Sequence, residues 1–528
     1  DYTEQFVFDI CKLKSLNCDF TPLQIILEDP RTEKIGHNIV FDYKFIKHHL
    51  GIELVNVFDT MLAEMILTKG FKLQGFGLQD VLDKYNIQSD MNKAIRIEFI
   101  NHQPNAEFTT EEIEYAAKDI KFLIKLKKIL IKHGEESNLL PIIKLENETV
   151  PCTGDLELNG IYLDFTEWEK LEKVALEKRE KLKEKLFSYL PSNFDTTVLL
   201  PEKKREKILK KRAKQLTLDF DIQDIIDINF SSPIQVKGFL KVITGKDPSD
   251  TNEKTLKLVY RQPDGSLPDV IKDLLAYREA DKQYSTYGSE FYYANVNAVT
   301  KRIHSEFKQL GADSGRYSSN NPNLQNIPAL KEYRACFRAQ EGYTLVCADL
   351  RQFELRVLAE LALEKSWIDV MKNPKGDLHR YVAAVLYNLT EEQVTPELRT
   401  IGKTLNFSVS YGAGPTKVME TCNNAFIDAN INKQMTFDEA KDALNKYRVS
   451  FPAINKLLED SVKFVKKHHY AWSPLDGRKR YINIDWTSPK EVAHAANIAK
   501  NMCAQPINAS VMKKILVLLK KYIKDNKI

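Results

Sequence analysis

Residues 395–415 (TPELRTIGKTLNFSVSYGAGP) encode a helix together with both of its ends, and they constrain the fold more than any other segment. Thr395 is a preferred N-cap, and Pro396 suits the first turn because its missing N–H would have no helical partner there. Gly412 is suited to end the helix, since glycine adopts the left-handed conformation without strain. Positions four apart in a helix are rotated by only about 40°, so they form one stripe. The stripe here holds Arg399, Lys403, Phe407 and Tyr411.

This stripe predicts a functional face. A stripe that faces the core would not begin with two cations, and a solvated stripe would not end in two aromatic rings. Guanidinium and ammonium groups suit a polyphosphate, and aromatic rings suit stacking on bases. We therefore interpret it as a nucleotide-binding surface.

A second motif lies upstream, in residues 343–362 (YTLVCADLRQFELRVLAELA). Residues 344–348 predict a buried strand that ends at Asp349, and residues 353–361 then take up helical periodicity. A carboxylate at the end of a buried strand is well placed to hold a divalent cation such as Mg²⁺. For an isolated Asp, a helix cap is the alternative interpretation.

Length, cysteines and charge place limits on the class of protein. The chain has 528 residues, which predicts about three or four domains. It has no apolar run of the roughly 18–20 residues needed to span a bilayer, and its seven cysteines lack a C-x-x-C pair, which favours a reducing compartment. The net charge is only +4, but residues 202–214 hold eight Lys and Arg against two Glu. That run predicts either a solvated helix face or a phosphate-binding surface, and charge alone does not decide between them.

Three further elements are predicted from local pattern. Residues 1–135 have a mixed α/β pattern, in which residues 7–11 predict a short strand. The Asn-Gly pair within residues 156–164 (LELNGIYLD) predicts a β-hairpin. Residues 165–190 predict a long helix, because charged and apolar residues alternate there at helical spacing.

The motifs, in this order, resemble those of the family A DNA polymerases. The family's motif A, D-Y-S-Q-I-E-L-R, is matched by residues 349–356 (DLRQFELR), and its motif B is matched within residues 399–412 by Arg399, Lys403, Tyr411 and Gly412. Three other segments are also similar to the family's motifs, namely 311–328 (GADSGRYSSNNPNLQNIP), 475–482 (LDGRKRYI) and 501–510 (NMCAQPINAS). Collinear matches over roughly 200 residues are specific to this family.

The N-terminal third resembles a proofreading 3′–5′ exonuclease. Residues 35–46 (IGHNIVFDYKFI) are similar to its second motif, through Asn38 and Asp42. Residues 114–123 (EYAAKDIKFL) are similar to its third, through Tyr115 and Asp119. The position of these motifs before a polymerase pattern strengthens the resemblance.

The resemblance implies an α/β and α+β multidomain fold, with a ribonuclease H-like exonuclease domain followed by a right-hand polymerase domain. The implied division is 1–145 for the exonuclease, 146–300 for the thumb and start of the palm, 301–362 for the palm with motif A, 363–470 for the fingers with motif B, and 471–528 for the return to the palm. It also places the basic run 202–214 in or near the thumb, which favours phosphate binding.

The implied activity is template-directed DNA synthesis, in which a primer 3′-hydroxyl attacks a dNTP by two-metal phosphoryl transfer, with proofreading by the exonuclease. Asp349 and the carbonyl of Leu350 are expected to bind metal, as are Asp42 and Asp119 in the exonuclease. Each active site would hold two Mg²⁺ ions, with Mn²⁺ as the alternative ion. The resemblance assigns the remaining residues in three sets: Arg399, Lys403 and His379 to the triphosphate; Gln352, Glu354, Phe407 and Tyr411 to the nucleotide; and Arg316, Asn323, Gln325 and Gln505 to the minor groove of the primer–template.

Two parts of the family pattern are missing from the printed sequence. Motif C, which supplies a second catalytic aspartate, would fall just past Ile528, and the exonuclease D-x-E is mimicked only by Asp9 with Cys11 in the place of Glu. We therefore expect a fragment or one part of a split polymerase. A catalytically inactive primer–template-binding remnant is a second hypothesis, and a single-subunit RNA polymerase, disfavoured by Glu354, is a third.

The expected partners and setting follow from the same resemblance. Primer–template DNA and dNTPs are the expected ligands, no membrane is expected, and the protein is expected to be a monomer, with a processivity factor or a complementary polypeptide as a further partner. The expected location is the cytoplasm of a bacterium or phage-infected cell, with an organelle as the alternative.

Overall fold

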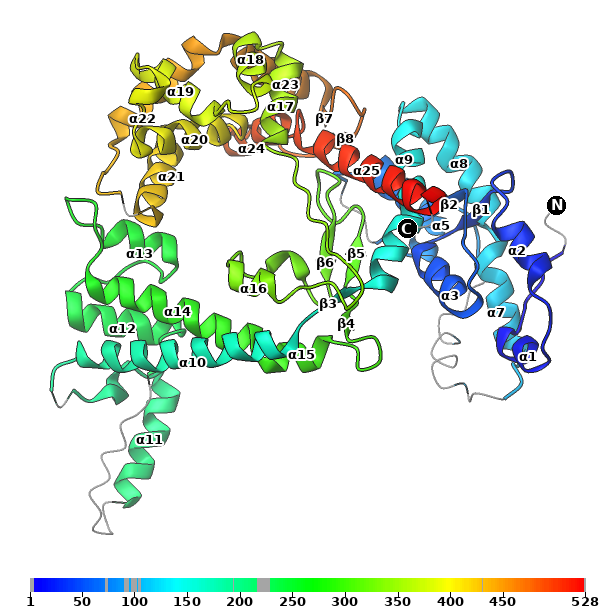
Figure 1. The fold of residues 1–528 in the computed structure, drawn as a ribbon, viewed down its shortest axis with the longest axis horizontal. Coiled ribbons are helices and arrows are strands. Elements are labelled where there is room, and N and C mark those ends of the chain that lie inside the picture. Colours follow the sequence, from blue (N-terminus) through cyan, green and yellow to red (C-terminus); the bar gives the residue numbers. More distant parts are fainter. Residues whose placement is uncertain are drawn as a thin grey trace.

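The structure is a computed structural model that describes residues 4–71, 75–89, 95, 102, 106–192, 194–215, 228–429 and 431–526. Its elements form four groups arranged as an open ring with an arm (Figure 1). The N-terminal elements form the arm, a long helical bundle forms one side of the ring, a second helical group lies opposite it, and short strands lie between.

The N-terminal group packs helices on a small parallel sheet. Its elements are α1 (Ile10–Ser15), α2 (Thr21–Leu27), β1 (Lys34–Gly36), α3 (Val40–Leu50), β2 (Val57–Asp59), α4 (Thr60–Leu67), α5 (Leu78–Lys84), α7 (Thr110–Lys121), α8 (Leu123–Glu136) and α9 (Leu140–Asn159). Strands β1 and β2 pair in parallel, with Ile35 opposite Phe58. Buried apolar residues of α4, α8 and α9 form the core with this sheet.

The predicted strand at residues 7–11 is wrong. Helix α1 begins at Ile10, and the Asp9 carboxylate caps it by accepting a hydrogen bond from Lys12 N (2.9 Å). Phe6 and Phe8 are exposed, and among the described residues no strand pairs with this segment. An apolar run without a pairing strand leaves its N–H and C=O groups to water, so the helix cap decides the conformation.

The predicted hairpin at residues 156–164 is also wrong. Helix α9 continues to Asn159, and Gly160 follows it with φ +55°. Strand β3 (Ile161–Tyr162) then pairs antiparallel with β4 (Arg302–Ile303), far along the chain. An Asn-Gly pair fits a helix end as well as a hairpin turn, because glycine tolerates positive φ in both.

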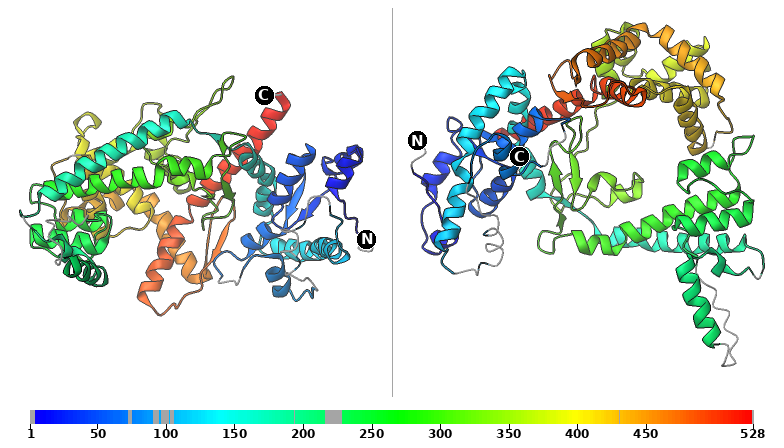
Figure 2. Two further views of the ribbon diagram at one scale, coloured as in Figure 1. Left: turned by 90° about the horizontal axis from the view of Figure 1, so that it is seen from below. Right: turned by 180° about the vertical axis from the view of Figure 1, so that it is seen from behind.

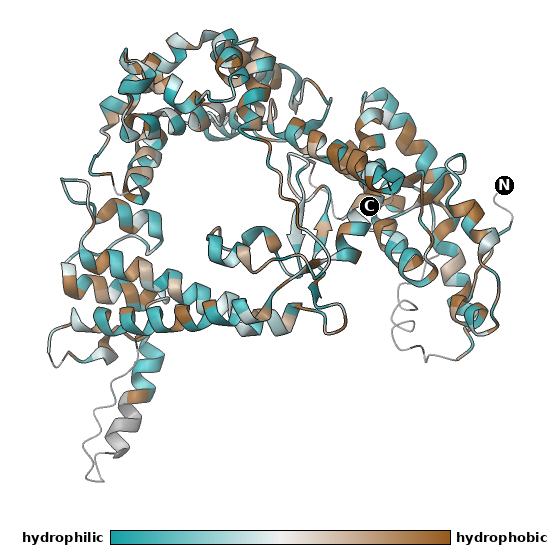
Figure 3. Ribbon diagram, viewed as in Figure 1, coloured by the Kyte–Doolittle hydropathy of each residue, from teal (hydrophilic) through white to brown (hydrophobic). Residues whose placement is uncertain are grey.

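A long helical bundle forms one side of the ring. Its elements are α10 (Phe165–Ser188), η1 (Thr196–Leu199), α11 (Glu202–Gln215), α12 (Pro233–Thr244), α13 (Glu253–Val259), α14 (Asp269–Tyr287) and α15 (Ser289–Asn295). The predicted helix at 165–190 is confirmed as α10. Helices α10 and α14 lie side by side, and hydrophilic and hydrophobic residues alternate along both (Figure 3). Helix α11 projects from the bundle, with the side chains of residues 202–207 exposed; the side chains of 209–214 lie outside the described set.

Short elements connect the bundle to the rest of the ring. They are β4, β5 (Glu306–Lys308), β6 (Ser318–Asn320), η2 (Leu324–Asn326) and α16 (Lys331–Ala335). Strands β5 and β6 pair antiparallel, with Phe307 opposite Ser319. The turn between these two strands carries Arg316, and the turn after β6 carries Asn323 and Gln325, which were all predicted to contact DNA.

The second helical group contains the predicted nucleotide-binding helix. Its elements are α17 (Phe353–Ala362), α18 (Lys365–Lys372), α19 (Leu378–Tyr387), η3 (Glu391–Gln393), α20 (Pro396–Ser410), α21 (Pro415–Asp428), α22 (Phe437–Ser450), α23 (Pro452–His468), β7 (Tyr470–Trp472), β8 (Lys479–Tyr481), α24 (Pro489–Asn501) and α25 (Gln505–Asn526). Buried residues such as Trp367 and Phe451 form its core. Helix α25 extends from this group to the N-terminal group, where it packs on α9 (Figure 2). No described helix has the length and apolar character that a bilayer crossing needs.

The predicted buried strand at residues 344–348 is not formed. The segment has no regular structure, Val346 is 85% exposed, and Asp349 is exposed as well. Strand formation requires a neighbour for the backbone N–H and C=O groups, and none of the described residues pairs with this segment. The predicted helix that follows does form, as α17.

Candidate active site and DNA-binding surface

Glu354 is the centre of a polar cluster that joins separate segments of the chain. It lies in the first turn of α17, where its Oε1 accepts a hydrogen bond from the Tyr411 hydroxyl (2.8 Å) and its Oε2 pairs with Arg316 Nη2 (3.2 Å). Burial raises the pKa of Tyr411 and the bond to Glu354 raises it further, while a hydrogen bond with Gln505 acts in the opposite direction. The structure therefore brings together four residues that were predicted to bind nucleotide or DNA.

Helix α20 has the ends and the stripe that were predicted. The Thr395 hydroxyl accepts a hydrogen bond from Leu398 N, and Gly412 has φ +75°. The side chain of Lys403 is exposed, and those of the other three stripe residues are half-buried, whereas Ile401 and Leu405 on the opposite side are buried in the core. The stripe is thus the accessible face of the helix.

Arg399, at the start of the stripe, is tied to the neighbouring helix. Its Nε donates to Asp377 Oδ2 (2.7 Å), and the same Asp377 caps α19 by accepting from His379 N and Arg380 N. Partial burial alone would raise the pKa of Asp377, but the bond from Arg399 holds it below its ordinary value. A guanidinium has four further N–H donors besides Nε, so Arg399 can be oriented by Asp377 and still bind phosphate.

His379 lies beneath the stripe rather than on the surface. The residue is 5% exposed, and its Nδ1 lies 3.0 Å from Asn406 Nδ2. An amide N–H donates in that arrangement, which leaves the ring proton on Nε2. Burial lowers the pKa of His379 to about 4, with the charges of Arg399 and Lys403 adding to the shift. The imidazole is therefore neutral at pH 7 and is available as a hydrogen-bond donor, not as a cation.

Asp349 and Leu350, the predicted metal ligands of motif A, lie at the surface before α17. The next residue but one, Gln352, is half-buried and takes a left-handed conformation (φ +51°) that turns the chain into the helix. Across the described residues, no group of three or more His, Cys, Asp and Glu side chains is arranged to hold a metal ion. The described residues therefore do not fit a complete two-metal site.

Two predicted minor-groove residues stabilise a turn. Asn323 caps η2 by accepting a hydrogen bond from Gln325 N (3.0 Å), and Gln325 Nε2 donates to the Tyr317 carbonyl (3.2 Å). Both residues are exposed. The bond to Tyr317 ties this turn to the residue that follows Arg316.

The predicted exonuclease residues lie around the end of β2. Asn38 has φ +61° before α3, Asp42 lies in the first turn of α3, and Tyr115 and Asp119 lie one turn apart on α7. Although Asp42 reaches the surface, the surrounding protein desolvates its carboxylate, and this raises its pKa to about 6. The charges of Asp59 and Asp119 contribute to the same rise, so Asp42 lies within electrostatic reach of both carboxylates.

Asp59 was not predicted, although it organises this region. It is fully buried at the end of β2, and its carboxylate accepts hydrogen bonds from the backbone N–H groups of Asn38 (3.0 Å) and Ile39 (2.9 Å). It also caps α4 through Met61 N (2.8 Å). The sequence VFD-TMLAEMIL has the same strand–Asp–helix pattern that was used for Asp349, so the same rule would have found it.

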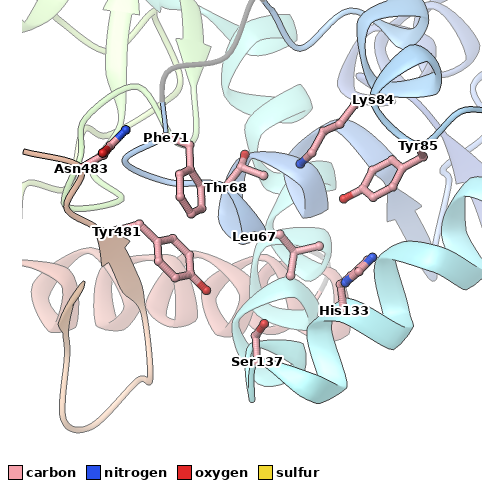
Figure 4. Close-up of a pocket in the computed structure, with 9 residues that line it drawn as sticks. All are labelled: Leu67, Thr68, Phe71, Lys84, Tyr85, His133, Ser137, Tyr481 and Asn483. Atoms are coloured by element: carbon pink, nitrogen blue, oxygen red, sulfur yellow. The ribbon is translucent and has the colours of Figure 1, made fainter. Parts of the chain in front are cut away.

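The N-terminal and C-terminal parts meet at β8. Tyr481 N donates to the Lys69 carbonyl (2.8 Å), and the rings of Tyr481 and Phe71 stack with centroids 4.5 Å apart. A cavity of about 490 Å³ opens beside these rings, where Tyr85 and His133 also line it (Figure 4). Its lining contains no carboxylate, so it does not supply the oxygen ligands that Mg²⁺ prefers from Asp and Glu.

Comparison with known proteins identifies both parts. The family model described as DNA polymerase family A matches residues 202–528, and the model described as 3′-5′ exonuclease matches residues 1–135. The chain is 28% identical to the DNA polymerase I of Borreliella burgdorferi over 93% of the chain and 49% of that protein. It is 27% identical to the DNA polymerase I of Chloroflexus aurantiacus over 96% of the chain and 50% of that protein, so it spans about half the length of these curated relatives.

A solved structure has the same fold. The polymerase domain of Pol1 from M. smegmatis, in complex with DNA primer-template and dNTP, superposes with a TM-score of 0.71 at 22% identity. The match covers 96% of the chain and 78% of that structure.

Proposed function

The chain belongs to DNA polymerase family A, and on that premise we propose that it performs template-directed DNA synthesis with 3′–5′ proofreading. The observation that carries the proposal is the cluster in which Glu354 is held between Arg316 and Tyr411 beside the accessible stripe of α20. This arrangement offers a groove-contacting cation, a sugar-facing carboxylate and a base-stacking ring within one cluster, followed by two cations for phosphate along the same helix.

In the proposed reaction the primer 3′-hydroxyl attacks the α-phosphate of a dNTP, and pyrophosphate leaves. Arg399 and Lys403 bind the β- and γ-phosphates, and Lys403 is the candidate proton donor to the leaving pyrophosphate. Neutral His379 adds a hydrogen bond, and Phe407 and Tyr411 contact the base and sugar with Gln352 nearby. Glu354 excludes a ribose 2′-hydroxyl, because a second oxygen there would meet a carboxylate already bonded on both sides.

A divalent cation would supply Lewis-acid stabilisation of the developing phosphoryl charge. Asp349 and the Leu350 carbonyl are the candidate ligands at the synthetic site, and Asp42 and Asp119 at the excising site, with Mg²⁺ the proposed ion and Mn²⁺ its substitute. The described residues do not complete a two-metal site.

We also propose the division of the chain that the family pattern implies. It assigns residues 1–145 to the exonuclease, 146–300 to the thumb and start of the palm, 301–362 and 471–528 to the palm, and 363–470 to the fingers. Primer–template DNA and dNTPs are the proposed ligands of a monomer in the cytoplasm of a bacterial cell.

Primer extension tests the proposal. The chain is incubated with a labelled primer–template, Mg²⁺ and the four dNTPs, and in parallel with a primer that ends in a mismatch. Extension of the matched primer and excision of the mismatched one are expected, with Arg399→Ala abolishing extension and Asp42→Ala abolishing excision. Extension that persists in Arg399→Ala would contradict the nucleotide assignment.

Primer–template binding without extension is a second candidate function. It is favoured by the single motif A carboxylate, Asp349, that lies at an exposed position without further ligands among the described residues. Fluorescence anisotropy of the same primer–template, in the same buffer, separates the two candidates: binding without extension supports the second.

A further inference from the structure

A buried charged cluster connects helix α9 to the turn that carries Arg316, a predicted DNA contact. Glu146 of α9 is 0% exposed, and it lies against Lys513 of α25, which is 1% exposed, and against the buried Arg478 before β8. Charges at such depth are strongly desolvated, and an apolar set of similar volume often gives equal or greater stability. The cluster therefore calls for an explanation other than stability.

Lys513 is hydrogen-bonded to the backbone of the β5–β6 turn. Its Nζ donates to Glu146 Oε1 (2.6 Å) and to the carbonyls of Gln309 and Gly315 (both 2.8 Å). These three bonds use all three protons of the ammonium group. Burial lowers the pKa of Lys513 to about 8, and it would raise that of Glu146, but Lys513 and Arg478 keep Glu146 below its ordinary value. The cluster is charged at pH 7.

The Arg478 guanidinium packs against the same turn, next to Gly315. Its Nη2 pairs with Glu146 Oε1, and its Nε donates to Ser510 Oγ (3.1 Å). Gly315 has φ +81°, and a Cβ built there would lie 2.8 Å from Arg478 Nη1. A glycine is thus required by both the backbone conformation and the approach of the guanidinium.

The residue that follows this turn is Arg316. Its guanidinium reaches Glu354 on α17 (3.2 Å), and its side chain is about half exposed. An exposed arginine on a mobile turn would lose conformational entropy on binding, whereas a turn that is already fixed loses less. Arg316 is bonded directly to Gly315. The Gly315 carbonyl accepts a hydrogen bond from Lys513, and the Arg478 guanidinium packs against the position of its missing Cβ.

We propose that Glu146, Lys513 and Arg478 are positioning residues that fix the Gly315 turn, so that Arg316 is pre-oriented for the primer–template. Helix α9 then contributes to the DNA affinity of the chain through the carboxylate of Glu146. This inference rests on the proposed function, in that it takes Arg316 as a DNA contact.

A double-mutant cycle on primer–template binding tests the proposal. Dissociation constants are measured by fluorescence anisotropy at fixed salt for the full chain, Glu146→Gln, Arg316→Ala and the double variant. Glu146→Gln and Arg316→Ala are each expected to weaken binding about tenfold, and the double variant is expected to bind no more weakly than Arg316→Ala, because residues that act through one another are not additive. Glu148→Gln is the matched control: it lies on the same helix, its partners Lys514 and Lys144 are at the surface, and its affinity is expected to stay unchanged.

The outcomes distinguish the positioning role of Glu146 from the assignment of Arg316 as a DNA contact. The positioning role is overturned if the dissociation constant of the double variant rises by the product of the two single-variant factors. It is also overturned if Glu146→Gln loses thermal stability but keeps its DNA affinity. In both cases Arg316 remains a DNA contact. An Arg316→Ala variant that binds as tightly as the parent overturns the DNA assignment and the inference with it. If Glu146→Gln does not fold, Lys513→Met replaces it in the cycle, because this variant removes the bond to Gly315 and leaves the Glu146–Arg478 pair; the same non-additivity is expected.

Discussion

At the scale of single residues, Glu354 is the residue that we propose to select the sugar. Its two oxygens are occupied by Tyr411 and Arg316, so the carboxylate is fixed at the entrance to α17. We expect Glu354→Ala to reduce the preference for dNTP over rNTP at least tenfold, because the site can no longer reject a 2′-hydroxyl. The ratio of kcat/KM for dATP and ATP in primer extension measures the effect.

Glu360→Ala is the control for this change, since Glu360 lies on the same helix with its side chain at the surface. An unchanged ratio in Glu354→Ala would mean that the carboxylate does not contact the sugar.

His379 makes stability depend on pH. Burial lowers its folded-state pKa to about 4, below the value of 6.5 for an unperturbed histidine, so between these values the unfolded chain binds more protons. The neutral His379 therefore contributes fully to the free energy of unfolding above pH 6.5. This contribution falls by up to roughly 3 kcal/mol as the pH falls towards 4. Urea unfolding of the parent and of His379→Gln, repeated at several pH values, measures the difference.

The free-energy difference between these two proteins is expected to shrink below pH 6.5. A difference that stays constant from pH 7 to pH 4.5 would show that folding does not lower the pKa of His379.

At the scale of elements, the close approach of α19 and α20 sets the position of the stripe. A Cβ at Gly402 would lie 2.3 Å from the His379 carbonyl, so the two helices can approach only because residue 402 is a glycine. We expect Gly402→Ala to force the helices apart, to destabilise the fold by about 1–3 kcal/mol and to weaken dNTP binding. Thermal unfolding and the KM for dNTP measure the two effects.

Thr400→Ala on the same helix serves as the control. The Thr400 hydroxyl donates only within its own helix in the described structure, to the Pro396 carbonyl (2.9 Å), and its loss is expected to change stability by no more than about 0.5 kcal/mol. Equal effects of the two changes would contradict the packing argument.

At the scale of the whole molecule, the junction at β8 couples the two parts. Tyr481 contributes a backbone bond to Lys69 and a ring stacked on Phe71. We expect Tyr481→Ala to weaken the junction by about 1–2 kcal/mol and to separate the unfolding of the two parts. All four tryptophans lie after residue 160, so their fluorescence reports the C-terminal part while circular dichroism reports the whole chain.

In the parent the two signals are expected to change at the same denaturant concentration, and in Tyr481→Ala at different ones. Tyr522→Ala, which removes an exposed ring from α25, should leave them coincident. Coincident transitions in Tyr481→Ala would show that coupling does not depend on this contact.

The success of prediction differed between local and non-local features. Helices α10, α17 and α20 formed where periodicity and caps placed them, because a helix satisfies its backbone within its own residues. The strands predicted at 7–11 and 344–348 did not form, because a strand needs a partner that the local sequence does not contain. The Asn-Gly pair at Asn159 and Gly160 was misinterpreted for the same reason, since both a hairpin and a helix end accept it.

The sequence by itself determined the family, the helix with its accessible stripe and the set of residues proposed to contact nucleotide and DNA, since all of these depend on residue type and spacing along one segment. Only the tertiary structure decided which of them meet. Arg316 meets Glu354 from a segment far away in the chain, and Lys513 likewise joins Glu146 to the Gly315 carbonyl. The burial that keeps His379 neutral also depends on the packing around it. Such contacts and the dielectric around them arise from packing, and no local pattern encodes them.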